Sequence, residues 1–369
     1  MSTTHPMKHP AYELTHNADR HTETIDTDAV RTRVNEVLLA FLDGKRREAE
    51  AAGHPRDLVE AVRGLVTAGG KRVRPLLCVV GWHAAGGDGD PGVVLRVAAA
   101  VEMWMTYALI HDDIIDDSET RRGRPTAQRA FAERFTAVRD AARYGASAAL
   151  LAGDLALGWA AELLHGAALG ETRQRVAGVF RVMLDEMVLG QYRDLLGAAV
   201  LSDDVDTALQ TVRFKTAAGT ATRPLQLGAA TAGATDLERF AAFGMLLGEA
   251  YQLRDDLLGV FGRSAETGKP VLDDLREGKG TVLLAAALRA ASGPQRALLE
   301  SLVGRPGLTE NDADRIRSVL VDTGARDRVE RMIRDRAEQA AVLIDAAGFP
   351  GHAAEALHRL ADRATQRTS

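Results

Sequence analysis

The chain has 369 residues, 46% hydrophobic and 26% charged, a composition that excludes a wholly disordered protein. Its 46 Lys and Arg against 51 Asp and Glu give a formal net charge of −5, which is too close to neutral for a general nucleic-acid binder. A single cysteine, Cys78, excludes an internal disulfide and a thiolate metal site, and its apolar neighbours predict a place in the core.

Residues 1–27 are predicted to form a flexible polar tail. They hold two prolines and four of the ten histidines, and they show no apolar period. The segment lacks the apolar stretch of a signal peptide, and no apolar run of about 18 residues is evident in the chain. We therefore expect a cytoplasmic protein without a membrane span.

Helical periodicity begins at Ala29, with apolar residues three and four positions apart, and recurs almost to the C-terminus. No proline occurs between Pro125 and Pro224, which suits long uninterrupted helices. Alternating strand patterns bounded by turn residues are not evident, and no break is long enough for an interdomain linker. We expect one all-α domain over residues 28–369.

An acidic segment follows a long apolar run and reads IHDDIIDDSETRRGRPT, residues 110–126. Asp112 and Asp116 are four positions apart and so share one helix face, about 6 Å from each other. They fall near the predicted C-terminus of a helix, where the macrodipole disfavours negative charge. A solvated acidic helix end is the simple interpretation of this segment alone.

A second acidic segment favours a functional interpretation. It reads YQLRDDLLGVFG and carries Asp255 and Asp256 after another apolar run, with Asp274 and Lys279 further along. Two helix-borne carboxylate sets, each followed by basic residues, indicate the facing walls of one cleft. Magnesium prefers oxygen ligands and is usually held by a few carboxylates together with substrate phosphates, which the basic residues would bind.

A basic segment lies upstream of both acidic ones and reads GGKRVRPLL, with Lys71, Arg72 and Arg74. Glycines before closely spaced cations at a helix start would bind phosphate with help from the backbone. A solvated basic face is the simple alternative. Together with the acidic segments, this one indicates a second anion pocket, built of cations rather than metal.

These motifs, in this order, resemble those of the trans-isoprenyl diphosphate synthases, or polyprenyl synthetases. The resemblance runs from about residue 30 to the C-terminal helices and also includes GQYRD at 190–194, FKTA at 214–217 and GKPVLDDLREGK at 268–279. It implies an all-α helical bundle, usually a homodimer, whose aspartate motifs face each other across a central cavity. The implied reaction joins isopentenyl diphosphate to an allylic diphosphate after magnesium-assisted ionisation of the allylic carbon–oxygen bond.

The resemblance also implies roles for individual residues. The ligands of three magnesium ions would be Asp112, Asp113, Asp116, Asp255, Asp256 and Asp274. The allylic diphosphate would be bound by Arg121, Lys215, Lys269 and Lys279. Isopentenyl diphosphate would be bound by Lys71, Arg74 and Arg122. Catalytic polar groups near the developing carbocation would be Lys215, Thr216 and Gln252.

Two positions depart from the family pattern. Met105 stands where a His or Gln usually contacts isopentenyl diphosphate, and a thioether cannot donate a hydrogen bond. We expect weaker isopentenyl binding from this change, although Met105 can equally be a core residue. Gly259 stands where an aspartate often ends the second motif, and we expect activity to survive that loss.

Product length in the family depends on the residues just before the first aspartate motif. Tyr107 and Ala108 lie five and four positions before Asp112, and Trp104 lies about one helical turn earlier. A bulky residue followed by a small one resembles the geranylgeranyl type, with farnesyl diphosphate as the alternative product. Tyr107 and Trp104 can instead be ordinary core aromatics.

Two other classes of protein share part of this pattern. A class I terpene cyclase shares the helical fold but has no second diphosphate substrate, and residues 255–259 lack the Asn/Ser/Glu metal triad that it would carry. A noncatalytic subunit of a heteromeric synthase would be expected to lose the first aspartate motif, which is present here. The sequence therefore favours a prenyltransferase.

Overall fold

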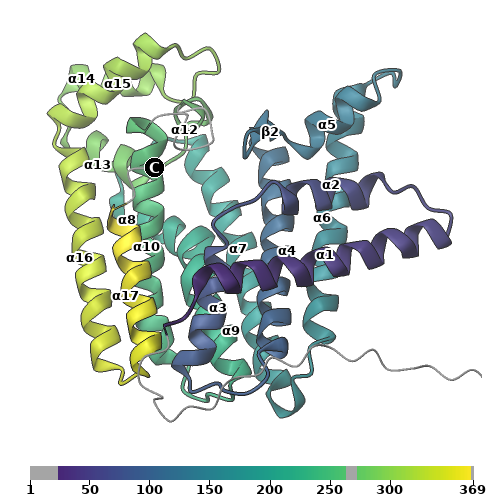
Figure 1. Cartoon of the computed structure of the whole chain (residues 1–369). Helices are drawn as coiled ribbons and strands as arrows, with labels where there is room; N and C mark the ends of the chain where they lie inside the picture. The colour runs from purple at the N-terminus through teal and green to yellow at the C-terminus, as the bar shows by residue number, and fades with distance from the viewer. Residues whose placement is uncertain (1–23, 263–271, 367–369) are drawn as a thin grey trace, which may run out of the picture.

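The computed structural model describes residues 24–262 and 272–366, and this part of the chain is almost entirely helical (Figure 1). The helices of the first half are α1 (Thr27–Ala51), α2 (Asp57–Thr67), α3 (Val73–Ala84), α4 (Gly92–Ile115), α5 (Ala127–Arg134), α6 (Ala141–His165), η1 (Gly170–Thr172) and α7 (Arg173–Ala199). Those of the second half are α8 (Val205–Thr211), η2 (Val212–Thr222), α9 (Arg223–Thr231), α10 (Glu238–Phe261), α12 (Asp273–Glu277), α13 (Val282–Ala290), α14 (Gly293–Leu302), α15 (Glu310–Asp322), α16 (Ala325–Ala346) and α17 (Gly351–Gln366). The all-α prediction is confirmed.

The start of α1 differs slightly from the expected one. The helix begins at Thr27 because the side chain of Asp26 caps it, accepting hydrogen bonds from the backbone N–H groups of Asp28 and Ala29 at 2.9 and 3.0 Å. The rest of the expected tail, residues 1–23, lies outside the described residues.

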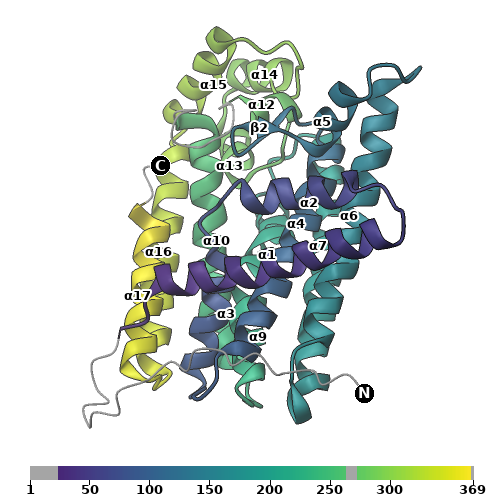
Figure 2. The same cartoon turned by 45° about the vertical axis from the view of Figure 1, so that its right-hand side comes forward.

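In both views α1 and α2 lie across the long helices rather than along them (Figures 1 and 2).

Helix α4 lies in the middle of one of two hydrophobic core clusters. It is apolar on every side, and a helix of that kind is stable only when it is buried all round. It packs against α6, α3 and α1, and its C-terminal end carries the first acidic motif. The second core cluster surrounds α10, which packs against η2, α16 and α17 and carries the second motif.

Burial accounts for the apolar character of α4, but for less than half of the apolar stretch of α6. By length and composition, α4 and α6 are each apolar enough to cross a membrane, which the sequence analysis did not anticipate. Most of the apolar stretch of α4 is buried inside the protein, whereas less than half of that of α6 is. Cys78 on α3 is fully buried, as expected, and burial raises the pKa of its thiol.

Two local features were not predicted. A small hairpin pairs β1 (Thr120–Arg121) with β2 (Arg124–Pro125) directly after the first acidic motif. The segment η2, which contains the FKTA motif, is a π-helix that runs into α9. Single π-helical turns are rare and occur often at functional sites, because the wider turn changes which side chains share a face.

Candidate active site

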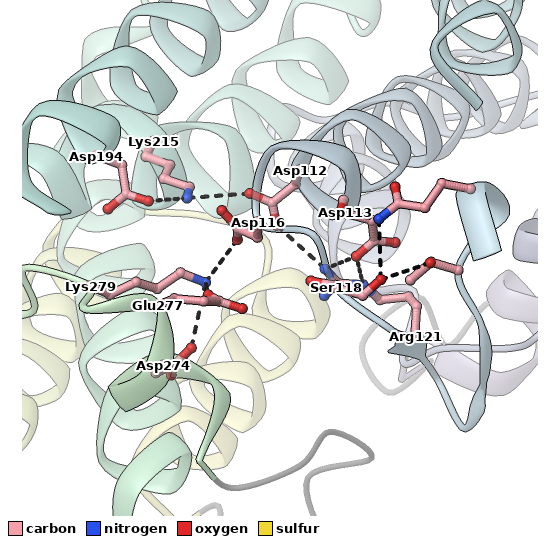
Figure 3. A network of polar contacts seen from close by, with 12 residues as sticks. Asp112, Asp113, Asp116, Ser118, Arg121, Asp194, Lys215, Asp274, Glu277 and Lys279 are labelled. Carbon is pink, nitrogen blue, oxygen red and sulfur yellow. Dashed lines mark hydrogen bonds and ion pairs between the residues drawn. The ribbon is translucent and has the colours of Figure 1, made fainter. Parts of the chain in front are cut away.

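The end of α4 presents its aspartates in two directions. Asp112 and Asp116 face the space between α4, η2 and α12, whereas Asp113 is buried and turned toward the hairpin (Figure 3). Nε of Arg121 donates to Asp113 Oδ1 at 2.8 Å, and a second guanidinium nitrogen also lies 3.4 Å from Asp112 Oδ2. Arg121 therefore neutralises the negative charge of these aspartates at the C-terminal end of α4, where the macrodipole disfavours negative charge.

Two neighbouring arginines of the hairpin point in different directions. Arg121 reaches the aspartates, while Arg122 adopts a left-handed conformation with φ of 54° and donates to the carbonyl oxygens of Leu65 and Gly69. These carbonyls belong to the end of α2 and the loop of the basic motif. The arrangement separates a cation at the metal motif from a cation at the expected isopentenyl site.

Lys215 on η2 connects two helices through its ammonium group. Its Nζ lies 2.5 Å from Asp194 Oδ2 on α7 and 3.4 Å from Asp112 Oδ1 on α4 (Figure 3). Burial lowers the pKa of Lys215, but the two carboxylates outweigh that effect and raise it above its usual value. Asp194 was not among the predicted site residues, although it ends the GQYRD motif.

Lys279 also lies among carboxylates of different helices, on α4 and α12. Its Nζ lies 3.0 Å from Asp116 Oδ2, 3.5 Å from Asp274 Oδ1 and 2.6 Å from Glu277 Oε2. Burial lowers its pKa, but the surrounding carboxylates raise it well above its usual value. Burial also raises the pKa of Glu277 to about 7, against the opposing effect of Lys279. Glu277 is a second residue that the sequence analysis missed.

The two aspartates of the second motif lie in different surroundings on α10. Asp255 is exposed, whereas Asp256 is buried and its Oδ1 accepts a hydrogen bond from Gln252 Nε2 at 2.7 Å. Burial raises the pKa of Asp256 to about 8; Gln252 opposes the shift, and Asp274 and Asp255 add to it. Gln252 therefore orients a carboxylate, besides its expected place near the carbocation.

The two arginines of the basic motif have different surroundings. Arg74 Nη2 donates to Thr220 Oγ1 on η2 at 2.7 Å, and Arg74 lies within electrostatic range of Asp255 and Arg122. Arg72 is instead buried in an ion pair with Glu102 of α4, with Nε donating to Asn35 Oδ1 at 3.0 Å. The burial of Arg72 leaves Lys71 and Arg74 as the predicted ligands of isopentenyl diphosphate, which stays a prediction.

Lys71 is exposed, and Thr216 is half-buried on η2 next to Lys215. Met105 is half-buried and packs against the core cluster around α4, so the core interpretation of this residue has structural support. Lys269 lies outside the described residues.

The predicted chain-length residues line one side of α4. Trp104 is fully buried, and its Cη2 is 2.8 Å from where a Cβ would stand on Gly219 of η2. Tyr107 is buried and its ring meets that of His111 edge-on, with 4.7 Å between centroids. Ala108 is half-buried against the same core. Trp104 therefore spans the distance between α4 and η2, the two helices that carry Asp112 and Lys215.

The donors in this site fit magnesium with a diphosphate rather than a fully protein-built cage. No three acidic, His or Cys side chains in residues 24–262 and 272–366 come together as a metal cluster. Asp256 Oδ2 is buried and has no hydrogen-bond partner within the described residues. Magnesium is usually held by few carboxylates, waters and substrate phosphates, which matches carboxylates separated by Lys215 and Lys279.

A cavity of about 270 Å³ lies behind Asp113 and Arg121, between α2, α5 and the hairpin. It is mainly apolar, with Leu65, Ile110 and Phe131 in its wall. Its wall includes Asp113 and Arg121 from the network of Figure 3, but not Asp116, Lys215 or Lys279.

Comparison with known proteins decides the family. A family model described as polyprenyl synthetase matches residues 55–320, a range that contains both acidic motifs and the basic one. The chain belongs to the polyprenyl synthetase family. As a polyprenyl synthetase it is a prenyltransferase, and the terpene cyclase and noncatalytic alternatives are not favoured.

Relatives with described activities differ in product. The chain is 35% identical over 300 residues to geranylfarnesyl diphosphate synthase of Aeropyrum pernix, covering 78% of this polyprenyl synthetase and 86% of the relative. It is 32% identical over 270 residues to geranylgeranyl diphosphate synthase of Saccharolobus solfataricus, covering 72% and 76%.

Among solved structures, geranylgeranyl pyrophosphate synthase of Corynebacterium glutamicum, complexed with isoprenyl diphosphate and magnesium, superposes with a TM-score of 0.89. The two are 39% identical, and the match covers 93% of this polyprenyl synthetase and 100% of that chain. The chain therefore has the fold of a protein whose solved structure contains isoprenyl diphosphate and magnesium.

Proposed function

We propose that the chain is a short-chain trans-prenyltransferase that joins isopentenyl diphosphate to an allylic diphosphate and releases geranylgeranyl diphosphate. The observation that carries this proposal is the position of Lys215 and Lys279 between carboxylates of different helices. Each lysine is held by acidic side chains until a diphosphate offers stronger acceptors, since charge-assisted hydrogen bonds to phosphate oxygens are among the strongest that proteins make.

Metal binding follows from the acidic motifs. Asp112 and Asp116 would hold two magnesium ions, and Asp255 with Asp256 and Asp274 a third. Bound magnesium supplies the Lewis acidity that stabilises the leaving diphosphate. Asp113 acts through Arg121, because its carboxylate is buried against that guanidinium.

Two sets of cationic side chains bind the diphosphates of the two substrates at separate places. Arg121, Lys215 and Lys279 donate to the allylic diphosphate and stabilise the negative charge that develops as the carbon–oxygen bond breaks. Lys71, Arg74 and Arg122 bind the diphosphate of isopentenyl diphosphate, so that its double bond faces the cation. Thr216 and Gln252 turn polar oxygens toward the developing positive charge, and the diphosphate that leaves accepts the proton.

Trp104 supports the geranylgeranyl assignment. Its indole closes the space between α4 and η2 one helical turn beyond Tyr107, so a growing hydrocarbon chain meets two aromatic rings in succession. Farnesyl diphosphate is the alternative if Tyr107 alone stops the chain. Since water would quench the cation, the apolar walls also protect the reaction.

We also propose that the protein is a homodimer that acts in the cytoplasm. Large apolar side chains are exposed along α7 and the start of η2: Val188, Leu189, Tyr192, Leu195, Leu196 and Phe214. Leu150 and Leu151 are exposed in the same way on α6. Contiguous exposed apolar side chains of this number indicate an interface rather than a solvated surface.

Incubation of the purified protein with magnesium, isopentenyl diphosphate and each of dimethylallyl, geranyl and farnesyl diphosphate tests the reaction. Chromatography is expected to show geranylgeranyl diphosphate as the longest main product. A cyclic hydrocarbon or no product would contradict the proposal, and a product that stops at farnesyl diphosphate would select the alternative.

Light scattering after size-exclusion chromatography tests the dimer. We expect twice the chain mass of 39.5 kDa, and a monomer for Leu189→Glu. Val342→Glu on α16 is the matched control, because Val342 is also exposed and apolar but lies outside α6, α7 and η2. A wild-type monomer, or an equal effect of both variants, would contradict the proposed interface.

A further inference from the structure

The π-helix η2 lies against two glycines, one on α7 and one on α10. A Cβ on Gly190 would stand 2.3 Å from the backbone nitrogen of Lys215. A Cβ on Gly248 would stand 2.4 Å from the carbonyl oxygen of Ala217. Real Cβ atoms do not approach other atoms so closely, and a backbone atom cannot rotate aside as the end of a side chain can. Only a residue without a Cβ therefore lets each helix pack so closely on η2.

The two contacts lie on opposite sides of η2. Lys215 and Ala217 are two positions apart, and two residues cover about half a helical turn. Helix α7 therefore limits η2 on the side of the Lys215 backbone, and α10 limits it on the other side. Because Gly190 and Gly248 are both buried in these contacts, η2 cannot move away from one helix without approaching the other.

Each glycine also lies one helical turn before a polar residue of the site. Gly190 is four positions before Asp194 on α7, whose Oδ2 lies 2.5 Å from Lys215 Nζ. Gly248 is four positions before Gln252 on α10. Residues four positions apart share a helix face. The closeness of η2 to these two faces therefore also sets the distance of its side chains from Asp194 and Gln252.

We propose that Gly190 and Gly248 are positioning residues, which fix η2 where Lys215 and Thr216 meet the allylic substrate. An alanine at 190 must move the Lys215 nitrogen from 2.3 Å to the 3.4 Å of an ordinary contact, a displacement of about 1 Å. A misplacement of about 1 Å can cost about 100-fold in rate. The inference rests on the proposed function, because that function assigns Lys215 to the allylic diphosphate.

Gly190→Ala tests the inference, and Gly145→Ala is its matched control. A Cβ on Gly145 of α6 would stand 2.2 Å from the carbonyl oxygen of Gln128 on α5, so it meets the same kind of obstacle at a contact away from η2. Gly190→Ala is expected to lower kcat about 100-fold. Gly145→Ala should lower stability but leave the kcat of the folded protein unchanged. Urea unfolding identifies the temperature at which both variants are folded.

A second readout separates positioning from a loss of folded protein. Calorimetry with inorganic pyrophosphate and Mg²⁺ gives both the number of binding sites and the Kd. Gly190→Ala should raise the Kd about tenfold with an unchanged number of sites, because a charge-assisted hydrogen bond from Lys215 is lost. A purely structural role would lower the number of sites instead. That result, a wild-type kcat for Gly190→Ala, or an equal fall in kcat for Gly145→Ala, would overturn the inference.

Two further variants test the route of the effect. Lys215→Met removes the ammonium group, so adding Gly190→Ala to it should weaken pyrophosphate binding little further, and additive losses would overturn the inference. Gly248→Ala gives the same test from α10 and does not need Gly190→Ala to fold; its kcat should also fall about 100-fold, and an unchanged kcat would contradict the role of Gly248. Failure of the proposed function would instead show as no product from the wild-type protein, whatever the variants bind.

Discussion

The indole of Trp104 on α4 lies directly against Gly219 on η2, with Cη2 2.8 Å from the position of a Cβ on that glycine. Any side chain at 219 would push the indole back toward α4. The pair joins the helix of the first aspartate motif to the helix of Lys215. We propose that it limits how far a hydrocarbon can extend between these helices.

Trp104→Leu is expected to give longer products than the wild type, because a smaller side chain opens the space next to Gly219. Complete truncation to Ala would cost about 3–5 kcal/mol of stability, so Leu is the better variant. Chromatography of the dephosphorylated products measures the effect. Trp159→Leu is the control, since that buried indole packs against Phe41 and should lose stability without altering product length.

Tyr107→Ala tests the residue five positions before the motif separately. The ring lies against His111 and is buried, so its removal should also lengthen the product. Comparing the product lengths of this variant, Trp104→Leu and the double variant shows which ring stops the chain. An unchanged product from Tyr107→Ala would make the residue an ordinary core aromatic.

Lys71 and Arg72 are neighbours with opposite expected phenotypes. Lys71→Met should raise the KM for isopentenyl diphosphate about tenfold or more, because one charge-assisted hydrogen bond is lost, and leave stability unchanged. Arg72→Met should lower the free energy of unfolding by about 3–5 kcal/mol, because Glu102 stays buried without its partner. Steady-state kinetics and urea unfolding separate the two, and reversed phenotypes would contradict the assignment.

Met105→His restores the donor that the family usually has at this position. If the side chain reaches the substrate, the KM for isopentenyl diphosphate should fall by about tenfold, the value of one charge-assisted hydrogen bond. A Met105→Leu variant controls for packing, because it keeps the volume and adds no donor. Equal KM values for all three proteins would leave Met105 as a core residue.

His83 on α3 gives the fold a pH dependence away from the site. Its ring meets that of His352 on α17 edge-on at 5.5 Å, and burial, together with His352, lowers its pKa to about 4. Because the unfolded chain binds a proton near pH 6.5 and the folded chain does not, stability should fall as the pH drops from 6.5 toward 4.

The expected loss is about 1–2 kcal/mol, since solvent still reaches part of the ring. His83→Gln should reduce this loss, whereas the control His54→Gln, at an exposed position between α1 and α2, should not. Urea unfolding at pH 7 and pH 5 measures the difference. A His83→Gln protein with an unchanged pH profile would contradict the assignment.

The helical class and the two acidic motifs could be read from local patterns, whereas the roles of the single site residues came from the family resemblance and stay predictions. The 3.6-residue apolar period identifies helices wherever one face is buried, and the spacing of Asp112 and Asp116 places both on one face regardless of the rest of the fold. The sequence could not show that η2 is a π-helix, because this depends on the packing of η2 against α7 and α10.

The residues that were not predicted escaped notice for a similar reason. Asp194 and Glu277 look like surface carboxylates in the sequence, and only the fold brings them to Lys215 and Lys279. Arg72 and Arg74 are two positions apart in one basic motif. Arg72 is held inside the fold by a buried ion pair with Glu102, which lies 30 residues later in the chain.

The hairpin after α4 has a mechanical consequence. Arg121 and Arg122 are consecutive, yet one contacts the carboxylates of the allylic side and the other the loop of the basic motif. Their α-carbons are about 3.8 Å apart, a spacing set by a single planar peptide unit. A tilt of this hairpin would therefore move both arginines together, so the two substrates that we propose they bind would keep their mutual alignment.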